Sequence, residues 1–158
     1  VRGCFTALYK NSVYLCFPCP DRQHPEGLEC RRVSGEGARR LTFGNKAIWI
    51  QKGAEGNRFT VCESITDCLA SVKFSGNENL LALNSVSNWH RAVEWLNANA
   101  GSILLALDDD EAGKRATSLI MRELTIPYKD VSSWYKEAGV KDFYRLLQKN
   151  NEDETWKN

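Results

Sequence analysis

From residue 59 onward, short apolar runs alternate with longer segments whose apolar residues recur at helical spacing. Apolar runs of this length indicate buried strands, and the periodic segments indicate amphipathic helices. We predict strands at Phe59–Cys62, Leu80–Leu83 and Ile103–Leu107, and helices at Ile65–Lys73, Trp89–Asn99 and Gly113–Leu124. Such alternation is typical of βαβ units, so the pattern predicts an α/β fold with a parallel sheet flanked by helices. Asn88 is the expected N-cap of the second helix.

The first third of the chain has a different pattern. Residues 1–12 show no clear periodicity, whereas Ser12–Pro18 and Leu28–Val33 are predicted to form a β-hairpin around a segment of turn formers. A further strand is predicted at Ala47–Ile50, and the Gly- and Asn-rich residues 53–57 are typical of a connection between two units. The sequence therefore predicts a small β-rich subdomain before the α/β domain.

The length of 158 residues suits one well-buried domain with a small appendage. We expect a β-rich basic subdomain at residues 1–57, the α/β domain at 58–150 and a polar tail at 151–158. Because the chain starts with Val1, we expect it to be part of a larger protein. It contains no apolar run of membrane-spanning length and no recognisable signal peptide, so we expect a cytoplasmic protein without a membrane partner.

Four carboxylates follow the third predicted strand directly, from Asp108 to Glu111. Successive strand residues face opposite ways, so Asp108 and Asp110 are expected on one side, with Asp109 on the other. Two carboxylates about 4 Å apart repel by roughly 4 kcal/mol at an effective dielectric near 20, and a divalent cation such as Mg²⁺ removes that penalty. A second carboxylate, Glu63, ends the first predicted strand. The alternative is a solvated acidic loop.

Two motifs, E-S-x-x-D at residues 63–67 and D-x-D-E-A-G at residues 108–113, resemble the signature motifs of the Toprim domain. Primases, topoisomerases and some nucleases share this domain. Upstream, F-P-C-P-D at residues 17–21 and the segment 27–31 resemble the hairpin that precedes the Toprim domain in DnaG-type primases. Residues 129–139 resemble the tail that closes it.

The sequence departs from the primase pattern at several positions. Val131 and Ser132 stand in place of a Pro and an Asp, Ser64 in place of a Gly, and Asn84-Ser85 in place of Gly-Thr. These departures fit a relative from a plasmid, phage or other mobile element better than a housekeeping primase.

The resemblance implies roles for individual residues. Glu63 would act as general acid or base and share the metal, Asp108 and Asp110 would bind Mg²⁺, and Asp130 would be an outer metal ligand. Mn²⁺ is expected to substitute for Mg²⁺ in such a site. The implied reaction is Mg²⁺-dependent nucleotidyl transfer, in which nucleoside triphosphates become an RNA primer on a single-stranded DNA template. A replicative helicase is a further implied partner. A Toprim nuclease and a non-catalytic nucleic-acid-binding module are the alternatives.

Charge is distributed unevenly along the chain. Residues 1–58 carry ten Lys or Arg against five Asp or Glu, and residues 59–158 carry eleven against fifteen. A basic segment beside an acidic one is expected of a phosphate-binding surface next to a metal site, although a solvated basic face is the alternative. The candidate nucleic-acid-binding residues are Arg31, Arg32, Arg39, Arg40 and Lys46.

The six cysteines allow two interpretations, reduced thiols or a zinc site. A chain with an ordinary apolar core does not need disulfides, so we expect reduced thiols. Cys16, Cys19, His24 and Cys30 come within one residue of the spacing of a zinc knuckle. In the primase hairpin, however, the corresponding positions are usually apolar, and we therefore do not expect zinc.

Overall fold

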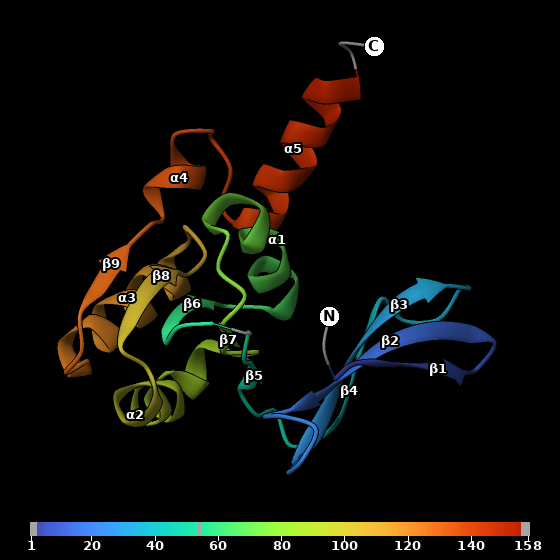
Figure 1. The fold of residues 1–158 in the computed structure, drawn as a ribbon. Coiled ribbons are helices and arrows are strands. Elements are labelled where there is room, and N and C mark those ends of the chain that lie inside the picture. Colours follow the sequence, from blue (N-terminus) through green and yellow to red (C-terminus); the bar gives the residue numbers. More distant parts are fainter. Residues whose placement is uncertain (1–2, 54, 156–158) are drawn as a thin grey trace.

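Two β-sheets lie side by side in the computed structural model, which describes residues 3–53 and 55–155 (Figure 1). The N-terminal sheet is antiparallel, with the strands in the order β1-β2-β3-β4. Its strands are β1 (Phe5–Tyr9), β2 (Ser12–Cys19), β3 (Gly27–Ser34) and β4 (Arg40–Gly44). The β2–β3 pair confirms the predicted hairpin.

The second sheet has five strands in the order β5-β7-β6-β8-β9. They are β5 (Trp49–Gln51), β6 (Arg58–Cys62), β7 (Leu80–Ala82), β8 (Ser102–Ala106) and β9 (Tyr128–Asp130). Strand β6 pairs in parallel with both β7 and β8, and β8 pairs in parallel with β9, whereas β5 is antiparallel to β7. The predicted parallel sheet is therefore confirmed, with one antiparallel strand at its edge.

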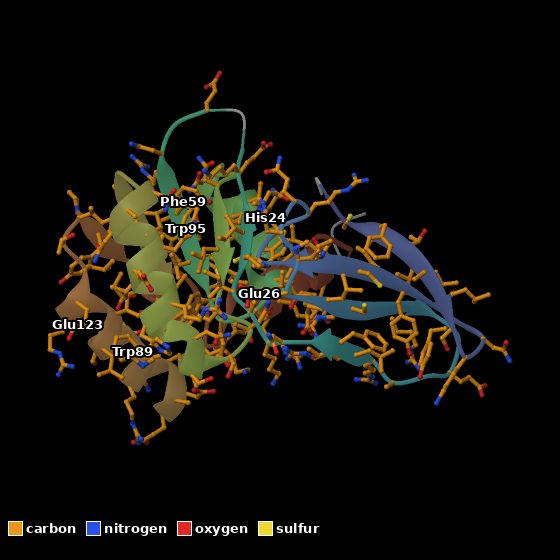
Figure 2. The ribbon with its side chains drawn as sticks, turned by 90° about the horizontal axis from the view of Figure 1, so that it is seen from below. His24, Glu26, Phe59, Trp89, Trp95 and Glu123 are labelled. Atoms are coloured by element: carbon orange, nitrogen blue, oxygen red, sulfur yellow. The ribbon has the colours of Figure 1, made fainter. Side chains whose placement is uncertain are left out.

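Helices cover both faces of this sheet. They are α1 (Ile65–Ser75), η1 (Val86–Asn88), α2 (Trp89–Asn99), α3 (Glu111–Glu123), α4 (Ser133–Lys136) and α5 (Phe143–Thr155). Alternate strand residues enter separate cores, as the two-residue period requires. Leu104 and Ala106 pack with α1 and α5, while Ile103 and Leu105 pack with α2 and α3. The core residues Phe59 and Trp95 meet edge to face, with ring centroids 5.1 Å apart (Figure 2).

Strand β1 was not predicted from the sequence pattern. Strand β1 turns into β2 through Lys10 and Asn11, which both have positive φ, at 47° and 60°. This is the mirror-image two-residue turn that suits the twist of a hairpin. The usual signal for it is a glycine, and neither turn residue is one.

Two helix starts also differ from expectation. Helix α3 begins at Glu111 and not at Gly113, because the Asp110 carboxylate accepts a hydrogen bond from the Gly113 N–H at 2.9 Å and caps the helix. Asn88 precedes α2 as predicted, but its side chain makes no capping hydrogen bond. Its amide donates instead to the carbonyl oxygens of Lys46 and Leu83, at 3.0 and 2.9 Å.

The N-terminal sheet joins the second sheet through β5. Phe17 of β2 packs edge to face on Trp49 of β5, with ring centroids 5.8 Å apart. The Ile50 N–H donates to the Pro20 carbonyl at 2.8 Å, and Arg91 of α2 pairs with Glu26 at 2.8 Å. Strand β5 thus belongs to the second sheet although it precedes residue 57, and the division of the chain at that residue stays a prediction.

The end of the chain was expected to be a polar tail at residues 151–158. Helix α5 continues to Thr155, and it extends away from the rest of the molecule (Figure 1). The last part of the expected tail, residues 156–158, lies outside the described residues. Within the described part of the chain, no helix combines the length and the apolar character needed to cross a membrane.

Candidate active site

Adjacent parallel strands bring the two acidic motifs together. Strands β6 and β8 pair in register from Arg58 and Ser102 to Cys62 and Ala106. Glu63 follows the first strand directly, and Asp108 lies two residues after the second. Because parallel strands end at the same edge of the sheet, Glu63 and the aspartates share the edge where α/β sheets place their ligands.

Glu63 lies partly buried at this edge. Its Oε2 atom is buried and accepts no hydrogen bond from the described residues. Burial and, after it, the negative charges of Asp108 and Asp110 together raise the pKa of Glu63 to about 7. A carboxyl with this pKa exchanges a proton near neutral pH, as general acid–base catalysis requires.

Asp108 is paired with a cation from its own chain. The Lys141 ammonium donates to Asp108 Oδ2 at 2.6 Å, and it lies 3.7 Å from Asp142 Oδ2. Burial raises the pKa of Asp108, which this hydrogen bond from Lys141 partly offsets. The backbone N–H of Asp109 donates to the Lys141 carbonyl at 2.8 Å, so the loop that carries Lys141 is tied to the loop after β8.

Asp110 contributes charge to the site while it caps α3. One of its oxygens accepts from Gly113, and its negative charge raises the pKa of both Glu63 and Asp108. The turn needs glycine at position 113, because a Cβ there would lie 2.1 Å from the Asp108 carbonyl oxygen. The glycine of the D-x-D-E-A-G motif therefore lets the helix start close against the strand end. Asp109, by contrast, pairs with Lys114 at 3.0 Å.

Asp67 supports the site from α1. It is 6% exposed, and it accepts hydrogen bonds from the Ser64 hydroxyl at 2.5 Å and from the Tyr144 N–H at 3.2 Å. Burial raises the pKa of Asp67 to about 6. The second acidic residue of the E-S-x-x-D motif thus joins the start of α1 to the start of α5.

Asp130 and Asp142 lie in different surroundings at this end of the sheet. Asp130, the expected outer ligand, is exposed at the end of β9, and its Oδ1 accepts from the Ser132 N–H at 2.8 Å. Asp142 is 8% exposed and lies beside Lys141, with its Oδ1 accepting from the Arg145 N–H at 2.7 Å. Sequence reasoning missed Lys141 and Asp142. An Asp before an amphipathic helix signals an N-cap, but nothing local signals proximity to Asp108.

The donor set suits a hard divalent cation. It consists of carboxylate oxygens, of which Glu63 Oε2 is buried without a hydrogen-bond partner among the described residues. The position of a cation beside Asp108 is taken by the Lys141 ammonium. Among the residues that the structure describes, no three His, Cys, Asp or Glu side chains are arranged to hold a metal ion together. Glu63, Asp108 and Asp110 could hold Mg²⁺ after their side chains turn toward a common point and Lys141 moves away.

Only two of the five predicted nucleic-acid-binding residues come together. Glu29 is 1% exposed on β3, and its carboxylate pairs with Arg31 at 3.1 Å and with Arg40. The Thr42 hydroxyl donates to the other oxygen of Glu29 at 3.0 Å. Burial lowers the pKa of Arg31, which the negative charges of Glu29 and Asp67 partly offset.

The other three basic residues lie apart from this pair. Arg32 follows Arg31 on β3 and therefore faces the opposite side of the sheet, where it donates to the Gly37 carbonyl. Arg39 and Lys46 are both exposed, the first before β4 and the second in the connection to β5. The basic residues thus form no single patch.

The four residues with near-zinc spacing do not converge. Cys16 and Cys30 face each other across β2 and β3, but Cys19 packs in a different core cluster. His24 is exposed in the turn between these strands, near Glu26 (Figure 2). Burial raises the pKa of Cys19 and of Cys30 to about 12, so both thiols stay protonated. All six cysteines fall in the described part of the chain, and none forms a disulfide.

Comparison with known proteins shows which family the chain matches. Residues 60–154, more than half of the chain, match the family described as Toprim-like. No curated protein matches the sequence.

Several solved structures share the fold. The primase fragment of the bacteriophage T7 primase-helicase protein aligns with a TM-score of 0.64 and 17% identity, over 98% of this chain and 65% of that chain. The DnaG primase catalytic domain bound to ssDNA aligns with a TM-score of 0.56 and 16% identity, over 86% and 48%. A DNA primase domain from Pseudomonas aeruginosa aligns with a TM-score of 0.51 and 16% identity, over 92% and 55%. The chain therefore spans 48% to 65% of the length of these relatives.

Proposed function

The chain belongs to the Toprim-like family, and from this premise we propose that it is the catalytic part of a primase-like nucleotidyltransferase. It would join nucleoside triphosphates into an RNA primer on a single-stranded DNA template, with Mg²⁺ as cofactor. One observation carries the proposal. Glu63, whose pKa lies near 7, shares a sheet edge with Asp108 and Asp110, and an arginine-bearing sheet is joined to that edge.

In the proposed reaction, the 3′-hydroxyl of the growing strand attacks the α-phosphorus of the incoming nucleotide. The bond to the β-phosphate breaks, and pyrophosphate leaves. Glu63 in its ionised form accepts the hydroxyl proton at Oε2, the oxygen that has no other partner in the described residues. Arg31 and Arg40, which Glu29 holds in place, bind phosphates of the substrate or template. Mg²⁺ at Glu63, Asp108 and Asp110 would neutralise charge on the transferred phosphate.

The fold likeness supports a primase over the other Toprim enzymes. The alignment with the T7 primase fragment covers 98% of this chain, so it includes the N-terminal sheet as well as the Toprim part. The departures at Ser64 and Asn84 favour a mobile-element relative, and a replicative helicase is a proposed partner. A nuclease with the same carboxylates is the second candidate, because phosphodiester hydrolysis needs the same charge arrangement.

The test is an assay of the full-length protein with Mg²⁺, labelled nucleotides and single-stranded DNA. Extension products support the primase, shortened DNA supports the nuclease, and binding without either supports a binding module. We expect Glu63→Gln to lower turnover by about 10²–10⁴-fold, because Gln cannot exchange a proton at neutral pH.

Glu123→Gln is the matched control for this variant. Glu123 is exposed at the far end of α3 from Asp110, and its carboxylate pairs with its neighbour Arg122 at 3.2 Å (Figure 2). Turnover in this control should be unchanged. Full activity in Glu63→Gln would contradict the assigned role of Glu63.

A further inference from the structure

Asn84 lies in the loop that follows β7, and its backbone holds Glu63. The Leu83 N–H donates to the Cys62 carbonyl at 3.0 Å, and the Asn84 N–H donates to the Glu63 carbonyl at 2.9 Å. These hydrogen bonds extend the β6–β7 pairing beyond the strand ends as far as Glu63. Asn84 has φ 57°, in the left-handed region, where Asn is tolerated far better than most residues other than Gly.

The rest of Asn84 connects to the N-terminal sheet. Its side-chain amide donates to the Ala47 carbonyl at 3.0 Å and to Cys19 Sγ at 3.4 Å. Its own carbonyl accepts from the Arg40 guanidinium at 3.2 Å. Asn84 is 5% exposed, so one buried residue contacts the catalytic loop, the connecting segment and an arginine of the N-terminal sheet.

The side-chain oxygen of Asn84 is unfavourable for folding. Its Oδ1 atom is buried and has no hydrogen-bond partner among the described residues. An unpaired buried acceptor is destabilising, and glycine would satisfy the left-handed backbone without it. The donated hydrogen bonds to Ala47 and Cys19 give the side chain a role that glycine cannot fill.

We propose that Asn84 is a positioning residue that fixes Glu63 relative to the arginines of the N-terminal sheet. Its left-handed backbone orients Glu63 through the hydrogen bond to the Glu63 carbonyl. Its side chain and carbonyl hold the connecting segment and Arg40 at a set distance from that loop. This inference rests on the proposed function, and it adds that template binding and proton transfer are aligned through one residue.

The two parts of the role can be separated by substitution. Asn84→Gly keeps the left-handed turn and removes only the side-chain hydrogen bonds. Asn84→Ala removes them too, and it also makes the left-handed backbone unfavourable. Asn88→Ala is the control for loss of a buried asparagine side chain. Asn88 also holds the connecting segment, through Lys46, but its second hydrogen bond goes to the Leu83 carbonyl and its φ of −84° is ordinary.

The experiment measures kcat, the KM for single-stranded template, and the carbonyl-carbon chemical shift of Glu63 by NMR in the full chain. Asn84→Ala should lower kcat by about 10- to 100-fold, since small misplacements of a catalytic group have such effects, and should move the Glu63 shift. Asn84→Gly and Asn88→Ala should raise the template KM but leave kcat and the Glu63 shift close to wild type.

Two results would overturn the inference. One is wild-type kcat and an unmoved Glu63 shift in folded Asn84→Ala. The other is a loss of kcat in Asn84→Gly, and this variant decides the matter if Asn84→Ala does not fold. Absence of primer synthesis by the wild type would contradict the proposed function instead, and the Glu63 shift would still test the role of Asn84.

Discussion

At the scale of single residues, the site is organised by uncompensated negative charge on Glu63. Its environment combines burial with two neighbouring aspartates, and both disfavour the ionised form. Lys141 lowers the pKa of Glu63 but contacts Asp108 and not Glu63 itself. The residue that the proposed reaction needs as a proton acceptor is thus the carboxylate with least direct compensation.

This environment predicts a pH dependence of folding stability. The pKa of Glu63 rises from an ordinary 4.5 to about 7 on folding, so the folded protein binds more protons in this interval. The contribution of Glu63 to stability is therefore fully present below about pH 4.5 and is lost as the pH rises through 7. We compare the free energy of unfolding of Glu63→Gln with that of the wild type at each pH. Since Glu63 is only partly buried, we expect this difference to favour the variant by about 1 kcal/mol more at pH 8 than at pH 5.

Urea unfolding in EDTA at both pH values measures this difference. Asp67, whose pKa also rises on folding, contributes with the same sign to both proteins and cancels in the comparison. An identical pH profile for wild type and Glu63→Gln would mean that Glu63 titrates normally.

At the scale of secondary-structure elements, the sequence predicted the strands and helices that have a clear apolar periodicity. The alternation of apolar runs and helical segments located β6, β7, β8 and the helices between them, because burial on both faces imposes that pattern. Strand β1 was not predicted because its residues are mostly exposed and its Lys-Asn turn lacks glycine. Glu63 and Asp108 were brought together as expected. Lys141 and Asp142 reach the site through the packing of α5 on α1, which no local pattern encodes.

The loop before α5 supplies an element-scale prediction about metal binding. Mg²⁺ at Asp108 must displace the Lys141 ammonium, which pairs with it at 2.6 Å. Breaking an exposed ion pair costs about 0.2–1 kcal/mol, so Lys141→Met should tighten Mn²⁺ binding by up to about fivefold. Calorimetric titration measures this change.

Lys136→Met provides the comparison for that measurement. Lys136 pairs with Asp109 at 3.5 Å and not with Asp108, so its loss should leave the Mn²⁺ affinity nearly unchanged. Asp108→Asn should weaken Mn²⁺ binding clearly. Equal affinities in wild type and Lys141→Met would show that Lys141 does not compete with the metal.

At the scale of the whole molecule, the arginines of the N-terminal sheet are of two kinds. Arg40 forms an ion pair with Glu29 and donates a hydrogen bond to the Asn84 carbonyl, so its removal would also disturb the junction between the sheets. Arg39 is exposed before β4, and its side chain forms no hydrogen bond or ion pair with the residues that the structure describes. Arg39 therefore tests nucleic-acid binding with little effect on folding.

We expect Arg39→Ala to weaken binding of single-stranded DNA and to reduce the slope of log K against log salt by about 0.7, the value for one lost phosphate contact. Fluorescence anisotropy with a labelled oligonucleotide at several salt concentrations measures both quantities. Arg122→Ala, on the exposed face of α3, is the control for loss of one positive charge. Equal effects of the two substitutions would place the nucleic acid elsewhere.

The position of β6 within the sheet has a consequence for how such proteins can diversify. The strand that ends at Glu63 has a partner on each side, and the N-terminal sheet is attached through β5, an antiparallel strand at the edge. Sheets and helices can therefore be gained, lost or exchanged at the margins without shifting the register that aligns Glu63 with Asp108. A single arrangement of carboxylates can in this way be inherited by proteins with very different accessory parts.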